Sequence, residues 1–128
     1  YEDRMVSALA RAERGDRVVF TRQTFAEAPD VWTARDVRAL DGATRVTTAN
    51  PHAAEYALGR RVLVDYANAK GRRLQGTLAL PANYEPGKRY PMIVYFYEKV
   101  SQRHHEFSLP VYDDRPHFST YASDGYLV

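Results

Sequence analysis

The longest uninterrupted apolar run in the chain lies at residues 92–97 and reads MIVYFY. It begins directly after Pro91 and is interrupted only by two phenol hydroxyls. A run of strand length that is rich in β-branched and aromatic side chains is typical of a strand covered on both faces, as in a parallel sheet. Ile93 and Val94, coming just after a proline, disfavour a helix. We therefore expect a buried strand that ends at Tyr97, and the carboxyl end of such a strand is where ligands of open α/β sheets collect.

The first fifty residues predict one helix and three short strands. Residues 2–14 carry apolar side chains at helical spacing, and Gly15 follows as a C-cap. Short β-like runs then cover residues 17–21, 31–34 and 44–48, with turn-forming residues between them. Short strands at this spacing predict an antiparallel meander, such as one blade of a β-propeller.

The pattern changes at Asn50-Pro51, where the proline keeps Asn50 out of the helical region and marks the best candidate boundary. Residues 61–66 and 74–80 predict a hairpin around the turn at Lys70-Gly71. Residues 116–123 predict a short helix after a proline.

Gly125 is expected to end that helix, and residues 126–128 to open another strand. The order of hairpin, buried strand, helix and strand predicts a mixed α/β fold. We expect residues 1–50 to be the end of one β domain and residues 51–128 to be the start of an α/β domain. The chain is thus expected to be a piece of a longer protein.

Composition narrows the function classes only slightly. The chain has 128 residues, 45% of them hydrophobic and 27% charged, with a formal net charge of +2. Basic and acidic residues are interleaved, which gives no support for a nucleic-acid partner. There is no cysteine, so disulfides and thiolate metal sites are excluded, and no apolar run has the length of a membrane span. No cofactor is indicated, and the compartment stays open.

Four motifs carry a family resemblance. They are N-P at 50–51, L-x-G-x-L-x-L-P at 74–81, N-Y-x-P-G-K-x-Y-P at 83–91 and G-Y at 125–126. In this order they resemble the junction between propeller and catalytic domain in the prolyl oligopeptidase family of serine peptidases, most of all its bacterial dipeptidyl-peptidase and acylaminoacyl-peptidase-like branch. The resemblance implies the last strands of a β-propeller followed by the first part of an α/β-hydrolase domain.

The resemblance also implies a role for Tyr97. In that family the tyrosine that closes this strand donates its hydroxyl to the oxyanion hole, which stabilises charge that appears only in the transition state. On spacing alone, the favoured interpretation of Tyr97 is a strand-end aromatic residue whose ring is buried and whose hydroxyl meets water, and the resemblance reverses that preference. The segment Glu98-Lys99 departs from the glycine turn of many family members.

The sequence contains none of the three residues of a hydrolase triad. No G-x-S-x-G motif is present, and Ser123 reads as a helix-end residue. We therefore expect the 128 residues alone to be inactive, and the intact parent to cleave short peptides through an acyl-enzyme, with the remainder of the polypeptide as partner. The alternative is a β-rich binding or interaction module without catalysis.

Two groups of residues contain side-chain types that also occur in metal-binding or ligand-binding sites. His104-His105-Glu106 contains metal-ligand types but no i, i+4 pair, and a solvated loop is favoured over zinc. The resemblance implies that this loop lies near substrate or an interdomain surface. Arg60-Arg61 and Arg72-Arg73 read as solvated strand-edge charges.

Overall fold

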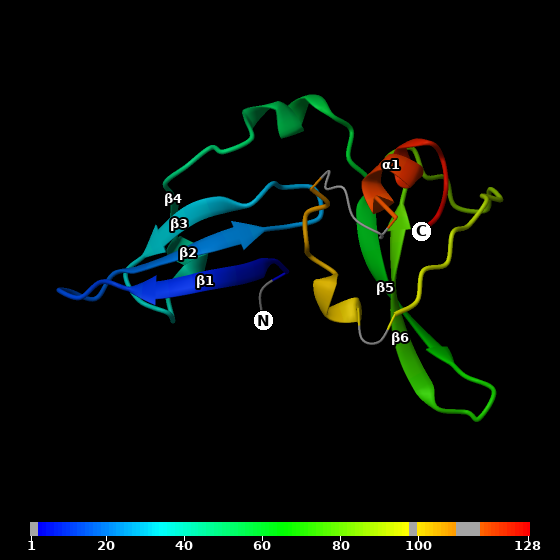
Figure 1. Ribbon diagram of the computed structural model, residues 1–128, viewed down its shortest axis with the longest axis horizontal. Coiled ribbons are helices and arrows are strands. Elements are labelled where there is room, and N and C mark those ends of the chain that lie inside the picture. Colours follow the sequence, from blue (N-terminus) through cyan, green and yellow to red (C-terminus); the bar gives the residue numbers. More distant parts are fainter. Residues whose placement is uncertain (1–2, 98–99, 110–115) are drawn as a thin grey trace.

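The computed structural model describes residues 3–97, 100–109 and 116–128 (Figure 1). They form two separate antiparallel sheets and one short α-helix. The elements in chain order are β1 (Met5–Arg11), β2 (Val18–Gln23), β3 (Asp30–Ala34), the 3₁₀-helix η1 (Leu40–Gly42), β4 (Thr44–Arg45), η2 (Pro51–Glu55), β5 (Arg60–Ala67), β6 (Arg73–Leu80), η3 (Ser101–Arg103) and α1 (Phe118–Ser123).

The first sheet is the predicted meander, with strand order β1-β2-β3-β4. Alternation along β2 sets its core, because Val18 and Phe20 are only 2% and 1% exposed while Val19 between them is exposed. Val18 lies opposite Ala34 on β3. These three buried side chains form the core of the sheet, and Trp32 packs against them. The three predicted strands of this half are confirmed, although the last is shortened to two residues.

The helix predicted over residues 2–14 is wrong. Met5–Arg11 is strand β1, which pairs with β2 from Met5 opposite Gln23 to Arg11 opposite Val18. The register shifts midway, next to Ala8, whose φ of 51° is left-handed. The helical spacing of apolar residues failed as a signal because Leu9, one of the positions it would bury, is 51% exposed.

The second sheet is the predicted hairpin, in which β5 and β6 pair from Arg60 opposite Leu80 to Ala67 opposite Arg73. The turn between them is held by Asn68, whose side-chain oxygen accepts from two backbone N–H groups at 3.0 Å.

The buried strand predicted for residues 92–97 is absent from the described residues. The run is extended, and Met92 forms one isolated parallel β-bridge with Leu127. Beyond that bridge, Val94 is 73% exposed and Phe96 is 87% exposed. An apolar run of β-branched and aromatic residues becomes a strand only where neighbouring strands accept its hydrogen bonds. Here, among the described residues, Leu127 accepts from the N–H of Ile93 and donates to the carbonyl oxygen of Pro91, both at 2.9 Å, and the pairing goes no further along the run.

The prediction of a mixed α/β fold, with propeller strands followed by an α/β-hydrolase sheet, is therefore wrong for the described residues. They are mostly β, and their one α-helix is α1, which matches the predicted helix near residues 116–123. The division between residues 1–50 and 51–128 stays a prediction. None of the helices in the described ranges is long and apolar enough to cross a membrane.

Candidate functional site

Residues 101–109, called here the junction segment, lie between the two sheets and are bonded to both (Figure 1). The backbone N–H of Phe107 donates to the side-chain oxygen of Gln23 at the end of β2, at 2.9 Å. On the other side, the hydroxyl of Thr77 on β6 lies 3.4 Å from Nδ1 of His104. The junction segment thus connects sheets that share no ladder hydrogen bonds.

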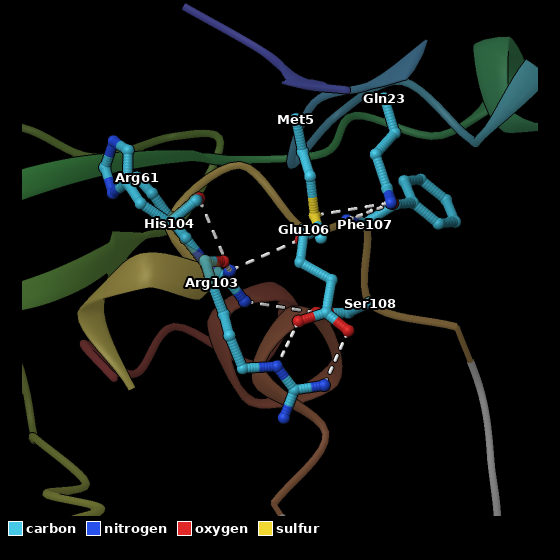
Figure 2. Close-up of polar contacts among 8 residues, drawn as sticks. All are labelled: Met5, Gln23, Arg61, Arg103, His104, Glu106, Phe107 and Ser108. Atoms are coloured by element: carbon cyan, nitrogen blue, oxygen red, sulfur yellow. Dashed lines mark hydrogen bonds and ion pairs between the residues drawn. The ribbon is translucent and has the colours of Figure 1, made fainter. Parts of the chain in front are cut away.

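The guanidinium of Arg61 holds the junction segment against β5, as Figure 2 shows. Its Nη1 donates to the carbonyl oxygen of Arg103 at 2.8 Å, and more weakly to those of His104 and Glu106 at 3.4 and 3.3 Å. Its Nη2 donates to the hydroxyl of Ser108 at 3.3 Å. The planar fork of an arginine suits several acceptors that converge in this way, because its donors have fixed directions.

Arg61 is also enclosed by aromatic rings. Its guanidinium carbon lies 4.4 Å from the ring centre of Phe25 and 5.2 Å from that of Phe118. A cation over an aromatic face is attracted by the ring quadrupole, more strongly when water is excluded. The rings therefore stabilise the charge on one side while the carbonyls of the junction segment do so on the other.

Every polar partner that the described residues offer Arg61 is neutral. Burial lowers its pKa to about 10, with Glu106 opposing that shift and Arg103 adding to it. At that pKa Arg61 remains protonated at neutral pH. Glu106 is occupied by Arg103, which binds it through two hydrogen bonds, one of them at 2.5 Å. Arg61 thus carries a positive charge that no carboxylate of residues 3–97, 100–109 or 116–128 contacts directly.

A pocket of about 170 Å³ opens beside Arg61, and we call it the junction pocket. Its lining residues are Thr24, Phe25, Ala26, Gly59, Arg60, Arg61, His104 and His105. The two imidazoles meet edge to face, with ring centres 4.6 Å apart. Burial lowers the pKa of His104, and the charges of His105 and Arg61 lower it further.

The sequence-predicted candidate Tyr97 lies away from this arrangement. Its side chain is 64% exposed, and it lines neither of the two pockets described for the chain. Across residues 3–97, 100–109 and 116–128, no three His, Asp or Glu side chains come together as a metal site. Glu98 and Lys99, which mark the departure from the family pattern, lie outside the described residues.

Sequence reasoning missed Arg61, which it treated as a solvated strand-edge charge. That interpretation holds for Arg73, which is exposed and paired with Asp65 at 2.8 Å. It fails for Arg61 because Phe25 and the junction segment, both distant in sequence, cover the side chain. The sequence of β5 gives no signal of this, because Val62, Leu63 and Val64 are apolar on both faces of the strand and so do not mark a buried face.

Comparisons with known proteins show what the fold is similar to. The scan against protein-family models finds no match, and neither does the search of curated proteins. Among solved structures, a serine-to-alanine variant of the AtxE2 isopeptidase with Astexin3-dC4 bound matches 98% of the chain, with a TM-score of 0.72 and 17% identity. The apo AtxE2 isopeptidase matches 97% of it, with a TM-score of 0.70 and 17% identity. The chain spans 18% of the length of each of these structures.

These findings correct the resemblance drawn from the sequence motifs. No family model supports membership of the prolyl oligopeptidase family, and the fold neighbours are isopeptidases. The motifs failed because two of their positions specify turns: Gly87 and Gly125 both have positive φ, at 86° and 85°. Residues chosen for such backbone conformations recur in unrelated folds, since glycine is favoured wherever φ must be positive.

Proposed function

We propose that this chain is part of a serine-type hydrolase that cleaves amide bonds in peptides. The observation that carries the proposal is the likeness of 98% of the chain to an isopeptidase, at a TM-score of 0.72. Hydrolysis of an amide proceeds through a tetrahedral intermediate, and later an acyl-enzyme where the nucleophile is a side chain. The 128 residues contain no G-x-S-x-G motif, so the nucleophile would come from residues outside them.

Within this proposal, Tyr97 donates its hydroxyl to the oxyanion of that intermediate. The side chain is 64% exposed, and it has no hydrogen-bond partner among the described residues, so its hydroxyl is available to a substrate. A preorganised donor of this kind stabilises charge that develops only in the transition state. Its loss should therefore lower kcat and leave KM nearly unchanged.

The test uses the protein as expressed from its gene, with a peptide joined by a side-chain amide bond and a linear peptide of the same composition as substrates. Cleavage is followed by mass spectrometry. Tyr97→Phe is compared with Tyr56→Phe, because Tyr56 has a similar exposed fraction of 69%. We expect Tyr97→Phe to lower kcat by about 10²–10³-fold, as for loss of one oxyanion donor. Equal rates in the two variants would show that Tyr97 takes no part in the reaction. Absence of cleavage of either substrate would favour a binding module.

A further inference from the structure

The junction pocket combines an open volume with an unbalanced charge. Four of its lining residues are arginine or histidine, and none is acidic. The two carboxylates nearest in sequence to the lining are engaged elsewhere, since Glu106 binds Arg103 and Glu27 lies 3.9 Å from Arg4. A concave site lined by one sign of charge raises the local concentration of the opposite charge.

The basic side chains of the pocket differ in how many of their hydrogen-bond donors already have a partner. Arg61 is committed, because both of its terminal nitrogens donate to the junction segment. Arg60 is exposed and makes no ion pair with any residue in the described ranges. His105 makes no hydrogen bond to the described residues; its ring contacts that of His104. The pocket thus presents free donors in front of a fixed buried cation.

We propose that the junction pocket binds a carboxylate group of a peptide, held by Arg60, His104 and His105 in front of the fixed charge of Arg61. The peptide part of this statement depends on the proposed function, whereas the carboxylate part depends only on the pocket. Arginine and protonated histidine form charge-assisted hydrogen bonds with carboxylates. The carboxylate has two sources in a peptide, the chain end and an Asp or Glu side chain.

The remaining lining favours a carboxylate attached to carbon over a free inorganic anion. Phe25 and Ala26 form the apolar wall. A volume of 170 Å³ is that of about six water molecules, which is room for one carboxylate and a short side chain. The apolar wall would contact the carbon atoms that carry the carboxylate.

Binding in this pocket should be coupled to protonation of the histidines. The groups that face His104 are His105, Arg61 and the hydroxyl of Thr77, with the pair formed by Arg103 and Glu106 beyond them. Arg61 and His105 disfavour the protonated form of His104, and a bound carboxylate would favour it. By linkage, the carboxylate should bind more tightly as His104 becomes protonated, and its binding should raise the pKa of His104.

The experiment measures binding to the protein as expressed from its gene. The probes are N-acetylglycyl-alanine, its C-terminal amide, the N-acetyl methylamides of glutamate and glutamine, and inorganic phosphate. Affinity is measured by calorimetry at pH 5.5 and pH 8, and histidine pKa values by NMR. We expect at least one carboxylate probe to bind about tenfold more tightly than its amide, a difference of about 1.4 kcal/mol, and phosphate to bind more weakly. Whichever carboxylate binds identifies the source.

Variants then locate the site. Arg60→Gln should weaken carboxylate binding about tenfold, as expected for loss of a charged contact. Arg89→Gln is the matched control, because Arg89 is also exposed, makes no ion pair with a described residue and does not line the pocket. His104→Gln together with His105→Gln should abolish the pH dependence. Arg61 is left intact because its loss would free the junction segment.

Three results would each overturn the inference. Equal affinity for acids and amides would do so, and so would equal effects of Arg60→Gln and Arg89→Gln. Tighter binding of phosphate than of either carboxylate would also contradict it. Peptide cleavage with no preference for carboxylates would refute the proposed carboxylate site but not the proposed hydrolase. Carboxylate binding without peptide cleavage would refute the proposed hydrolase but not the carboxylate site.

Discussion

Replacement of Arg61 by methionine should release the junction segment from β5. Methionine has a similar length and is apolar, so it keeps a contact with Phe25 while removing every hydrogen bond of the guanidinium. The bond to the carbonyl of Arg103, at 2.8 Å, is the best of the four, and the other three are 3.3–3.4 Å long. One good charged hydrogen bond and three weak ones together indicate a loss of about 2–3 kcal/mol.

The assay is hydrogen exchange at the backbone N–H of Phe107, which donates to Gln23 and so reports whether the junction segment is closed. A loss of 2–3 kcal/mol corresponds to roughly 30- to 150-fold faster exchange. The matched control is Arg73→Met on the same hairpin, because that guanidinium is 80% exposed and paired only with Asp65. Equal exchange at Phe107 in the two variants would show that Arg61 does not hold the segment.

Two further predictions concern stability of the protein in urea. Gly59→Ala would place a Cβ atom 1.9 Å from the carbonyl oxygen of Leu80, so we expect a loss of about 3 kcal/mol, whereas Gly42→Ala, with open space at its Cβ, should be nearly neutral. The carboxylate of Asp30 is 3% exposed, and although burial opposes its ionisation, hydrogen bonds led by that from Ala49 N–H hold its pKa below the ordinary value. Its stabilising effect should be complete above about pH 4 and disappear as the pH falls through that lowered pKa, so Asp30→Asn should cost about 2 kcal/mol at pH 7 and progressively less in acid.

The elements that sequence reasoning recovered are those whose signals are local. The β5–β6 hairpin was predictable because its alternation and its turn, with Gly71 at a φ of 74°, lie within one short stretch. The α1 helix was predictable because Pro116 marks its start locally. In the structure the helix begins at Phe118, and Nδ1 of His117 accepts from the N–H of Thr120 in its first turn. In both cases the residues that decide the structure are neighbours in the chain.

The failures arose where a distant partner decides the outcome. β1 is a strand because β2 accepts its hydrogen bonds, and a helical spacing of apolar residues carries no information about that partner. The run at residues 92–97 has strand propensity throughout, yet within the described part of the chain it is bridged only at Met92, where Leu127 is its neighbour. Arg61 was misjudged for the same reason, since it is covered by Phe25 and the junction segment.

The position of Tyr97 in the chain connects the two proposals. Ser101, which begins the junction segment, follows Tyr97 by four residues, and four residues span at most about 14 Å. Arg61 and Gln23 fix the junction segment from both sheets, so they also limit where the Tyr97 hydroxyl can lie. An oxyanion donor must be held within a fraction of an ångström of its productive position. If Tyr97 acts in this way, Arg61→Met should lower kcat through misplacement of an intact hydroxyl, while Tyr97→Phe removes the hydroxyl and leaves exchange at Phe107 unchanged.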